Sequence, residues 1–159
     1  MMARFEIALP NDLIKEFEKI NKNSHKMLEE MTQAGAEVVY NNVRSNMKSS
    51  FKDSHKLEKY LKITKSYTTP SDDGVNTKVA FYGYYKPEER TFSLTSKSGK
   101  TYSYNGIPVP LIIRAREFGS SSGEAKKPFF RKSFKKSQIE QAMLKAQDKY
   151  LKELKWIVW

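Results

Sequence analysis

The clearest pattern in the sequence is an apolar stripe that recurs at helical spacing through the first quarter of the chain. At about 100° per residue, its members fall within about 80° of the first one on a helical wheel. They are Leu13, Phe17, Ile20, Met27, Leu28, Met31, Ala34, Gly35, Val38 and Val39. The stripe keeps its phase through the polar residues 21–24, and Asn11 and Asp12 offer capping side chains. The pattern predicts one long helix over about 11–48, with a kink near 21–24 as the alternative.

Such a helix would span roughly 55 Å, which is longer than a compact domain of this size needs. Part of it must therefore project from the domain or pack on a neighbouring molecule.

The middle of the chain contains segments whose composition and alternation of side chains are typical of β-strands. Ser54 is expected to cap a short helix over about 54–61. Residues 62–85 then hold two segments rich in β-branched and aromatic residues around a Pro-Ser-Asp-Asp-Gly turn, which predicts a hairpin. A second hairpin is expected over 90–106 with its tip at Ser96–Lys100, and its polar alternation predicts an exposed arm. Residues 108–119 form a short apolar element that fits a strand or a helix.

The last element is predicted to be a helix over about 128–155, after a loop at 119–127, with Pro128 in its first turn. Its apolar stripe is Ile139, Met143, Ala146, Tyr150 and Leu154. Phe130 and Phe134 form a second pair, about 180° from Ile139 in an unbroken helix. Either the helix bends near residues 135–138, or both of its faces are buried, which would require another subunit.

These elements predict one α+β domain over residues 1–159. The long N-terminal helix and the C-terminal helix would pack on a small antiparallel sheet with a protruding β-hairpin.

Composition narrows the range of functions. The chain has 159 residues, no cysteine and a formal charge of +11, so disulfides and cysteine-bound metals are excluded. No apolar run reaches membrane-spanning length, and the first residues lack the pattern of a secretory signal. Residues 1–60 carry ten Lys/Arg against nine Asp/Glu, residues 61–118 nine against five, and residues 119–159 ten against four. The positive excess therefore grows toward the C-terminus.

Each candidate catalytic motif in the sequence lacks a residue or a structural context that its chemistry requires. Ser98–Thr101 resembles the end of a phosphate-binding loop, but Leu94 stands where that motif needs glycine. Glu124-Ala125-Lys126, with Asp72 and Asp73, could be fitted to a metal-dependent nuclease, but the triplet lies in a Ser/Gly loop rather than on a rigid strand. His25 and His55 lack metal-ligand spacing. We therefore predict no catalytic residue, no metal and no cofactor, and no cleavage of plasmid DNA with Mg²⁺ or Mn²⁺.

Basic residues near the second hairpin tip and before the final helix form the more substantial candidate. They are Lys97, Lys100, Lys126, Lys127, Arg131, Lys132, Lys135 and Lys136. One interpretation is a solvated surface, and the other is a surface that faces duplex DNA or an acidic partner. DNA binding of this kind would be weak, independent of sequence and strongly salt-dependent.

The segment "EFGSSSGEAKKPFFRKSF" resembles the signature of the tail-completion, or head–tail joining, minor structural proteins of long-tailed double-stranded DNA phages and prophages. Glu117, Phe118, Gly119 and Ser120 match its first part. Its second part is matched by Ala125, Lys127, Pro128, Phe129, Phe130 and Arg131. Lysine replaces the usual arginine, Phe130 replaces an aliphatic residue, and Asp53-Ser54-His55 stands where the family has Thr-Gly. The arm at 90–104 looks like an insertion.

The resemblance implies a structural protein of the phage neck. It would form a homo-oligomeric ring, commonly a hexamer, between the head connector and the tail tube, with DNA passing through it. It would be made in the cytoplasm of the bacterial host, reside in the virion and contact neighbouring neck proteins, and no membrane. Its expected assembly interface comprises Glu117, Phe118, Gly119, Pro128, Phe129, Phe130 and Phe134, with one of Phe129 and Phe130 anchored in the subunit core.

Three other functions stay open. The chain could be a tail terminator or a head stopper of the same neck. It could be a non-specific DNA-binding protein, although no recognition helix or stacking sheet is evident. The nuclease alternative is the third.

Overall fold

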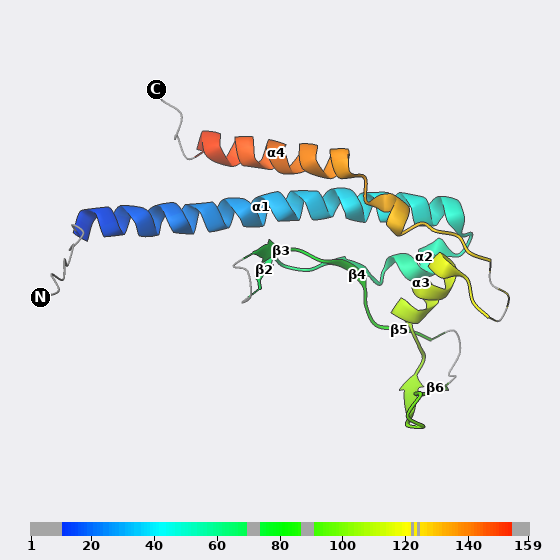
Figure 1. The fold of residues 1–159 in the computed structure, drawn as a ribbon. Coiled ribbons are helices and arrows are strands. Elements are labelled where there is room, and N and C mark those ends of the chain that lie inside the picture. The colour runs from blue at the N-terminus through cyan, green and yellow to red at the C-terminus, as the bar shows by residue number, and fades with distance from the viewer. Residues whose placement is uncertain (1–10, 70–73, 87–90, 122, 124, 154–159) are drawn as a thin grey trace, which may run out of the picture.

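A computed structural model describes residues 11–69, 74–86, 91–121, 123 and 125–153. Helix α1 (Asn11–Ser50) lies at the centre of the molecule. Helix α4 (Lys136–Glu153) runs antiparallel along one side of α1, and the strands follow its other side (Figure 1). The predicted α+β class is confirmed.

Helix α1 is a single helix of 40 residues, about 60 Å long at 1.5 Å per residue. It continues as α-helix through residues 21–24, so the prediction of one long helix is confirmed. Its first turns extend past the strands in Figure 1. Leu13, Phe17 and Ile20 belong to the part of α1 whose side chains lie outside the described residues.

Two faces of α1 are covered. Val39, Val43 and Met47 are at most 5 % exposed and join the hydrophobic core with Leu57, Leu61, Phe81, Val109, Ile113 and Phe129. Val39, Val43 and Met47 are four residues apart and share one face of α1, which meets the predicted stripe at Val39 and continues beyond it. The stripe itself passes through Gly35, which faces α4: a Cβ at Gly35 would stand 3.2 Å from Ile139 Cγ2 and from Met143 Cγ. Glycine therefore lets the two helices approach closely.

Within the described residues, the strands form four two-stranded antiparallel ladders. They pair β1 (Leu61–Ile63) with β4 (Val79–Phe81), β2 (Tyr67–Thr68) with β3 (Val75–Asn76), β5 (Tyr84–Tyr85) with β8 (Ile107–Pro108), and β6 (Thr91–Thr95) with β7 (Thr101–Asn105). The Thr64 N–H donates to the Lys78 carbonyl at 2.9 Å and links the first two ladders into one long hairpin. Both predicted hairpins are confirmed, as separate short ladders rather than one sheet.

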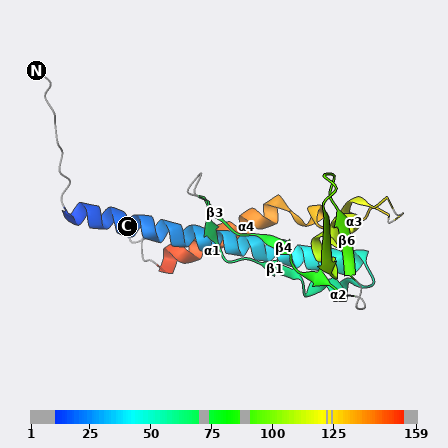
Figure 2. The ribbon, with the colours of Figure 1, turned by 90° about the horizontal axis from the view of Figure 1, so that it is seen from below.

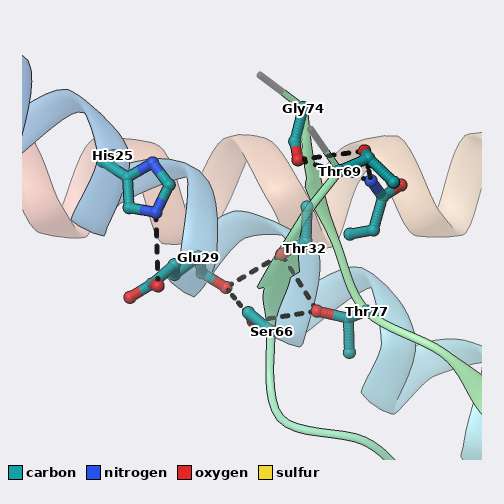
Figure 3. Close-up of polar contacts among 8 residues, drawn as sticks. His25, Glu29, Thr32, Ser66, Thr69, Gly74 and Thr77 are labelled. Atoms are coloured by element: carbon teal, nitrogen blue, oxygen red, sulfur yellow. Dashed lines mark hydrogen bonds and ion pairs between the residues drawn. The ribbon is translucent and has the colours of Figure 1, made fainter. Parts of the chain in front are cut away.

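Hydroxyl groups tie the end of the first hairpin to α1 (Figure 3). Thr77 Oγ1 lies 2.9 Å from Ser66 Oγ and donates to Thr32 Oγ1 at 3.1 Å. Thr32 Oγ1 donates in turn to the Glu29 carbonyl at 3.1 Å. His25, on the exposed side of α1, lies 3.5 Å from the Glu29 carboxylate. This network fixes the β2–β3 end of the hairpin along the helix.

The second hairpin, β6–β7, stands apart from the body; residues 91–105 are called the arm from here on. It lies at the end of the molecule where α1 meets α2 (Ser54–Glu58), and it points away from α1 (Figures 1 and 2). Its tip is held by the Ser96 N–H, which donates to the Lys100 carbonyl at 2.8 Å, and by Gly99 at φ 77°. The exposed polar arm was predicted correctly.

The segment predicted at 108–119 begins at the end of a strand and continues as a helix, so both structures that the sequence allowed are present. Strand β8 is followed at once by helix α3 (Val109–Phe118), with Pro110 in its first turn. Val109, Ile113 and Glu117 are buried and share one face because they are four residues apart.

Two predicted helix starts are corrected. Asp53, not Ser54, precedes α2, and its carboxylate makes no cap because Arg116 holds it. The final helix starts at Lys136 rather than at 128, after a single 3₁₀ turn, η1 (Arg131–Ser133). Phe134, at ψ 74°, separates the two. The bend was therefore the right alternative. Leu154 lies outside the described residues.

Candidate assembly site

Glu117 organises the segment that the sequence singled out. Its side chain points from the buried face of α3, and the residue is 3 % exposed. One carboxylate oxygen accepts the N–H groups of Phe129 at 2.8 Å and Phe130 at 2.9 Å. The other accepts the Arg131 N–H at 3.3 Å and the Arg131 Nε–H at 3.0 Å. We call this unit, Glu117 with residues 128–134, the clip.

The clip keeps its carboxylate ionised. Burial alone would raise the pKa of Glu117, but the N–H groups of Phe130 and Phe129 and the Arg131 guanidinium outweigh that effect and lower the pKa below its ordinary value. The carboxylate also caps the free N–H groups at the start of η1, although it comes from another helix. Its hydrogen bonds to the N–H groups of residues 129–131 therefore take the place of the helical turn that was predicted to start at Pro128.

Phe129 anchors the clip in the core. It is 1 % exposed and its ring meets Phe51 edge-on, with centroids 5.2 Å apart, and Phe81 at 6.4 Å. Phe130 is half-buried and lies 6.2 Å from Phe81 and 5.5 Å from Phe134. The two Phe129 pairs and the Phe130–Phe134 pair have the edge-to-face geometry that aromatic rings favour at these separations.

A second set of polar bonds holds the clip to α1. Asn42 Nδ2 donates to the Ser133 carbonyl at 3.1 Å, and Asn46 Nδ2 donates to Ser133 Oγ at 2.8 Å. Ser133 Oγ, fully buried, donates to the Phe129 carbonyl at 2.7 Å. Neither asparagine was predicted from the sequence to have a role. Their i, i+4 spacing on either side of the buried Val43 was the available signal.

An ion pair closes the other side of the clip. Arg116 donates two hydrogen bonds to the Asp53 carboxylate, at 2.9 and 2.7 Å, and these bonds lower the pKa of Asp53. The Arg116 guanidinium also covers the Phe51 ring at 4.7 Å. The Lys127 N–H donates to the Arg116 carbonyl at 2.9 Å and joins the loop to α3. This pair, too, was not expected from the sequence.

The predicted interface residues divide into an internal and an external group. Glu117 and Phe129 are buried within the subunit, where they hold the clip to its core. Phe118 and Phe134, by contrast, are 55 % and 52 % exposed. Gly119, at φ 83°, ends α3, and Pro128 is half-buried at the start of the clip.

An apolar groove of about 270 Å³ lies beside the exposed Phe118 ring. Phe81, Pro110, Ile113, Phe118 and Phe130 line it, with Arg114 and Arg131 at its edge. The Arg131 guanidinium covers the Phe118 ring at 4.8 Å while bonding to Glu117. The clip thus positions an exposed aromatic surface next to a hollow.

The predicted basic residues do not form one surface. Lys97 and Lys100 are exposed at the tip of the arm, on the opposite side of α1 from α4 (Figure 1). Lys132, Lys135 and Lys136 are exposed beside or at the start of α4, where Lys136 lies 3.6 Å from Glu140. Lys126 and Lys127 lie in the loop before the clip.

Other candidate chemistry stays dispersed. Glu124, Asp72 and Asp73 lie outside the described residues, and His55 is exposed. In the described ranges, no three His, Cys, Asp or Glu side chains group to hold a metal ion. None of the helices that the structure describes is long and apolar enough to cross a membrane.

Comparison with known proteins identifies one family. A family model described as "Bacteriophage HK97-gp10, putative tail-component" matches residues 11–92, about half of the chain. The match runs from α1 to the first residues of the arm and excludes the clip, so it is independent of the signature at 117–134. No curated protein and no solved structure matches the chain.

Proposed function

The chain belongs to the HK97-gp10-like family of bacteriophage tail components, and on this basis we propose that it is a structural protein of the virion neck. It assembles as a ring, completes the tail and joins the head connector to the tail tube. Duplex DNA passes through the ring, and the protein performs no catalysis. Within the neck, completion of the tail is our choice over the terminator and stopper roles.

The exposed aromatic surface around the clip is the observation that carries this proposal. About half of each of Phe118 and Phe134 is open to solvent. Phe118 lines the apolar groove, and Phe134 contacts Phe130, which also lines it. Full burial of the exposed half would contribute about 2–3 kcal/mol per ring at about 25 cal/mol per Å². Aromatic residues set in a hollow and flanked by arginine are typical of the residues that dominate protein–protein binding. The surface is therefore suited to a neighbouring subunit.

The clip supports the same function because it fixes this surface in place. Phe134 follows directly after η1, whose start is capped by Glu117 and whose last residue is held by Asn42 and Asn46. Phe118 is the last residue of α3 and is covered by Arg131. A surface that is ordered before binding loses less conformational entropy on assembly. A ring of identical subunits benefits from this at every contact.

Deletion and complementation of the gene test this proposal directly. Its deletion from a phage that encodes this protein should give full heads and separate tails, and the wild-type chain supplied in trans should restore joined particles. The double variant F118A/F134A should fold but fail to restore them. Leu144→Ala, which truncates an equally exposed side chain on α4 (55 %), is the matched control and should restore them. Normal joining without the gene would refute the proposal.

A further inference from the structure

A groove of about 550 Å³ lies where α1 ends and the loop before the clip crosses it. Lys48, Ser50 and Lys52 line it from the end of α1 and the turn that follows, and Lys127 lines it from the loop. Lys48 and Lys52 were not among the basic residues that the sequence singled out. The groove is separate from the apolar groove beside Phe118.

The groove carries an excess of positive charge. Among the described residues that line it, Asp53 is the one acid, and Arg116 holds both of its oxygens. Lys48 lies 3.6 Å from Glu58, a carboxylate that also bonds to Arg44. Among the described residues, and counting these neighbours, five cations stand against two carboxylates, which leaves an excess of three. That excess is available to an anionic ligand.

The end of α1 does not account for this charge. Cations are favoured at a helix C-terminus because its carbonyl groups carry about −0.5 of an elementary charge. Three uncompensated cations exceed that partial charge several-fold. The lysines therefore do more than complement the helix.

The floor of the groove is ordered. The Phe51 ring packs edge-on against the buried Phe129 and is covered by the Arg116 guanidinium at 4.7 Å. Lys127 Nζ lies 5.8 Å from the centroid of the same ring. Contacts with an aromatic face restrict a cation's side chain before any ligand arrives. The groove is thus organised by the residues that also hold the clip.

We propose that this groove binds the phosphate backbone of duplex DNA. The inference rests on the proposed function, in which DNA passes through the ring. Lysine ammonium groups and a serine hydroxyl are donors that phosphate oxygens accept, and such contacts carry no sequence information. The clip would then order the aromatic assembly surface on one side and the DNA contact on the other.

Salt dependence of DNA binding by the full chain tests the groove. Affinity for a short fluorescent duplex is measured by anisotropy for the wild type and for K52A/K127A. The double variant should lower the slope of log affinity against log salt by about 2, because two phosphate contacts are lost. Between about 50 and 200 mM salt, the wild type should therefore lose about tenfold more affinity than the variant.

A variant with equal charge loss controls for long-range electrostatics. K145A/K152A removes two exposed lysines from α4 and should keep the wild-type slope. Equal effects of the two double variants, or none for K52A/K127A, would overturn the inference. So would equally tight binding of a poly-glutamate peptide to the wild type.

Folding and the proposed function are checked separately. If K52A/K127A fails to fold by circular dichroism, the single variant Lys52→Ala, at an exposed residue, should lower the slope by about 1. An unchanged slope there counts against the groove. The slope is measured on isolated protein. If heads and tails join without the gene, the proposed neck function is refuted, but the measured slope, and with it the test of the groove, is unaffected.

Discussion

The clip and the arm are held together in opposite ways. The clip joins residues that are far apart in sequence: Asn46 bonds to Ser133, 87 residues away, and Glu117 bonds to residues up to 14 positions ahead. The arm is a local ladder in which Ser93 pairs with Ser103 and Thr95 with Thr101 through their hydroxyls. Long-range contacts connect the clip to the global stability of the chain, whereas the arm can change without disturbing the core.

Truncation of Phe129 should have the largest effect. Phe129→Ala removes a ring that is 1 % exposed and contacts Phe51 and Phe81, so it should destabilise the fold by about 3–5 kcal/mol. Phe134→Ala, at a residue 52 % exposed, is the matched control and should cost less than about 1 kcal/mol. Chemical denaturation measures both. Equal losses would mean that Phe129 does not anchor the clip.

Replacement of the buried carboxylate should have the next largest effect. Glu117→Gln keeps the shape but loses the charge that accepts three backbone N–H groups and the Arg131 Nε–H. We expect a loss of about 2–3 kcal/mol at neutral pH. Glu140→Gln is the control, because it breaks only an exposed pair with Lys136 and should cost less than about 0.5 kcal/mol.

The same variant has a pH signature. The pKa of Glu117 is lower in the folded chain than its ordinary value of 4.5. Its contribution to stability is therefore complete above that value and is lost as pH falls through the folded pKa. The wild type should lose its advantage over Glu117→Gln on acidification below pH 4.5, as followed by denaturation at several pH values. A difference that stays constant down to strong acid would argue against an ionised clip.

Removal of the arm should have the smallest effect on folding. Replacement of residues 93–103 by a short turn should change the free energy of unfolding by less than about 0.5 kcal/mol. The described side chains there are exposed apart from the half-buried Ser96, and the loop closure changes little. Thermal denaturation checks this expectation. A large loss would show that the arm belongs to the folding unit and would remove the contrast with the clip.

Local patterns predicted most of the architecture. The apolar stripe predicted a continuous α1 because helical phase is a property of neighbouring turns. The arm was predicted because a Ser-Gly turn between alternating strands closes on itself. The apolar stripe of α4 agrees in part, since Tyr150 is buried and Ile139 packs against the core.

The clip could not be predicted from local sequence patterns. Pro128 looked like a helix start because its missing N–H would cost nothing in a first turn. In the folded chain, the N–H groups that follow are taken by Glu117 from another helix, and the regular helix begins only at Lys136. The burial of Phe129 rather than Phe130, and the Arg116–Asp53 pair, likewise depend on which elements meet. These contacts are set by the tertiary structure and leave no signal in the local sequence.

A reconstruction of the neck in joined particles by electron cryo-microscopy tests the central claim most directly. We expect this chain as a ring around the DNA between the head connector and the tail tube, with Phe118 and Phe134 buried against the next subunit. A ring in which both phenylalanines face solvent, or a chain located elsewhere in the tail, would contradict the proposed function.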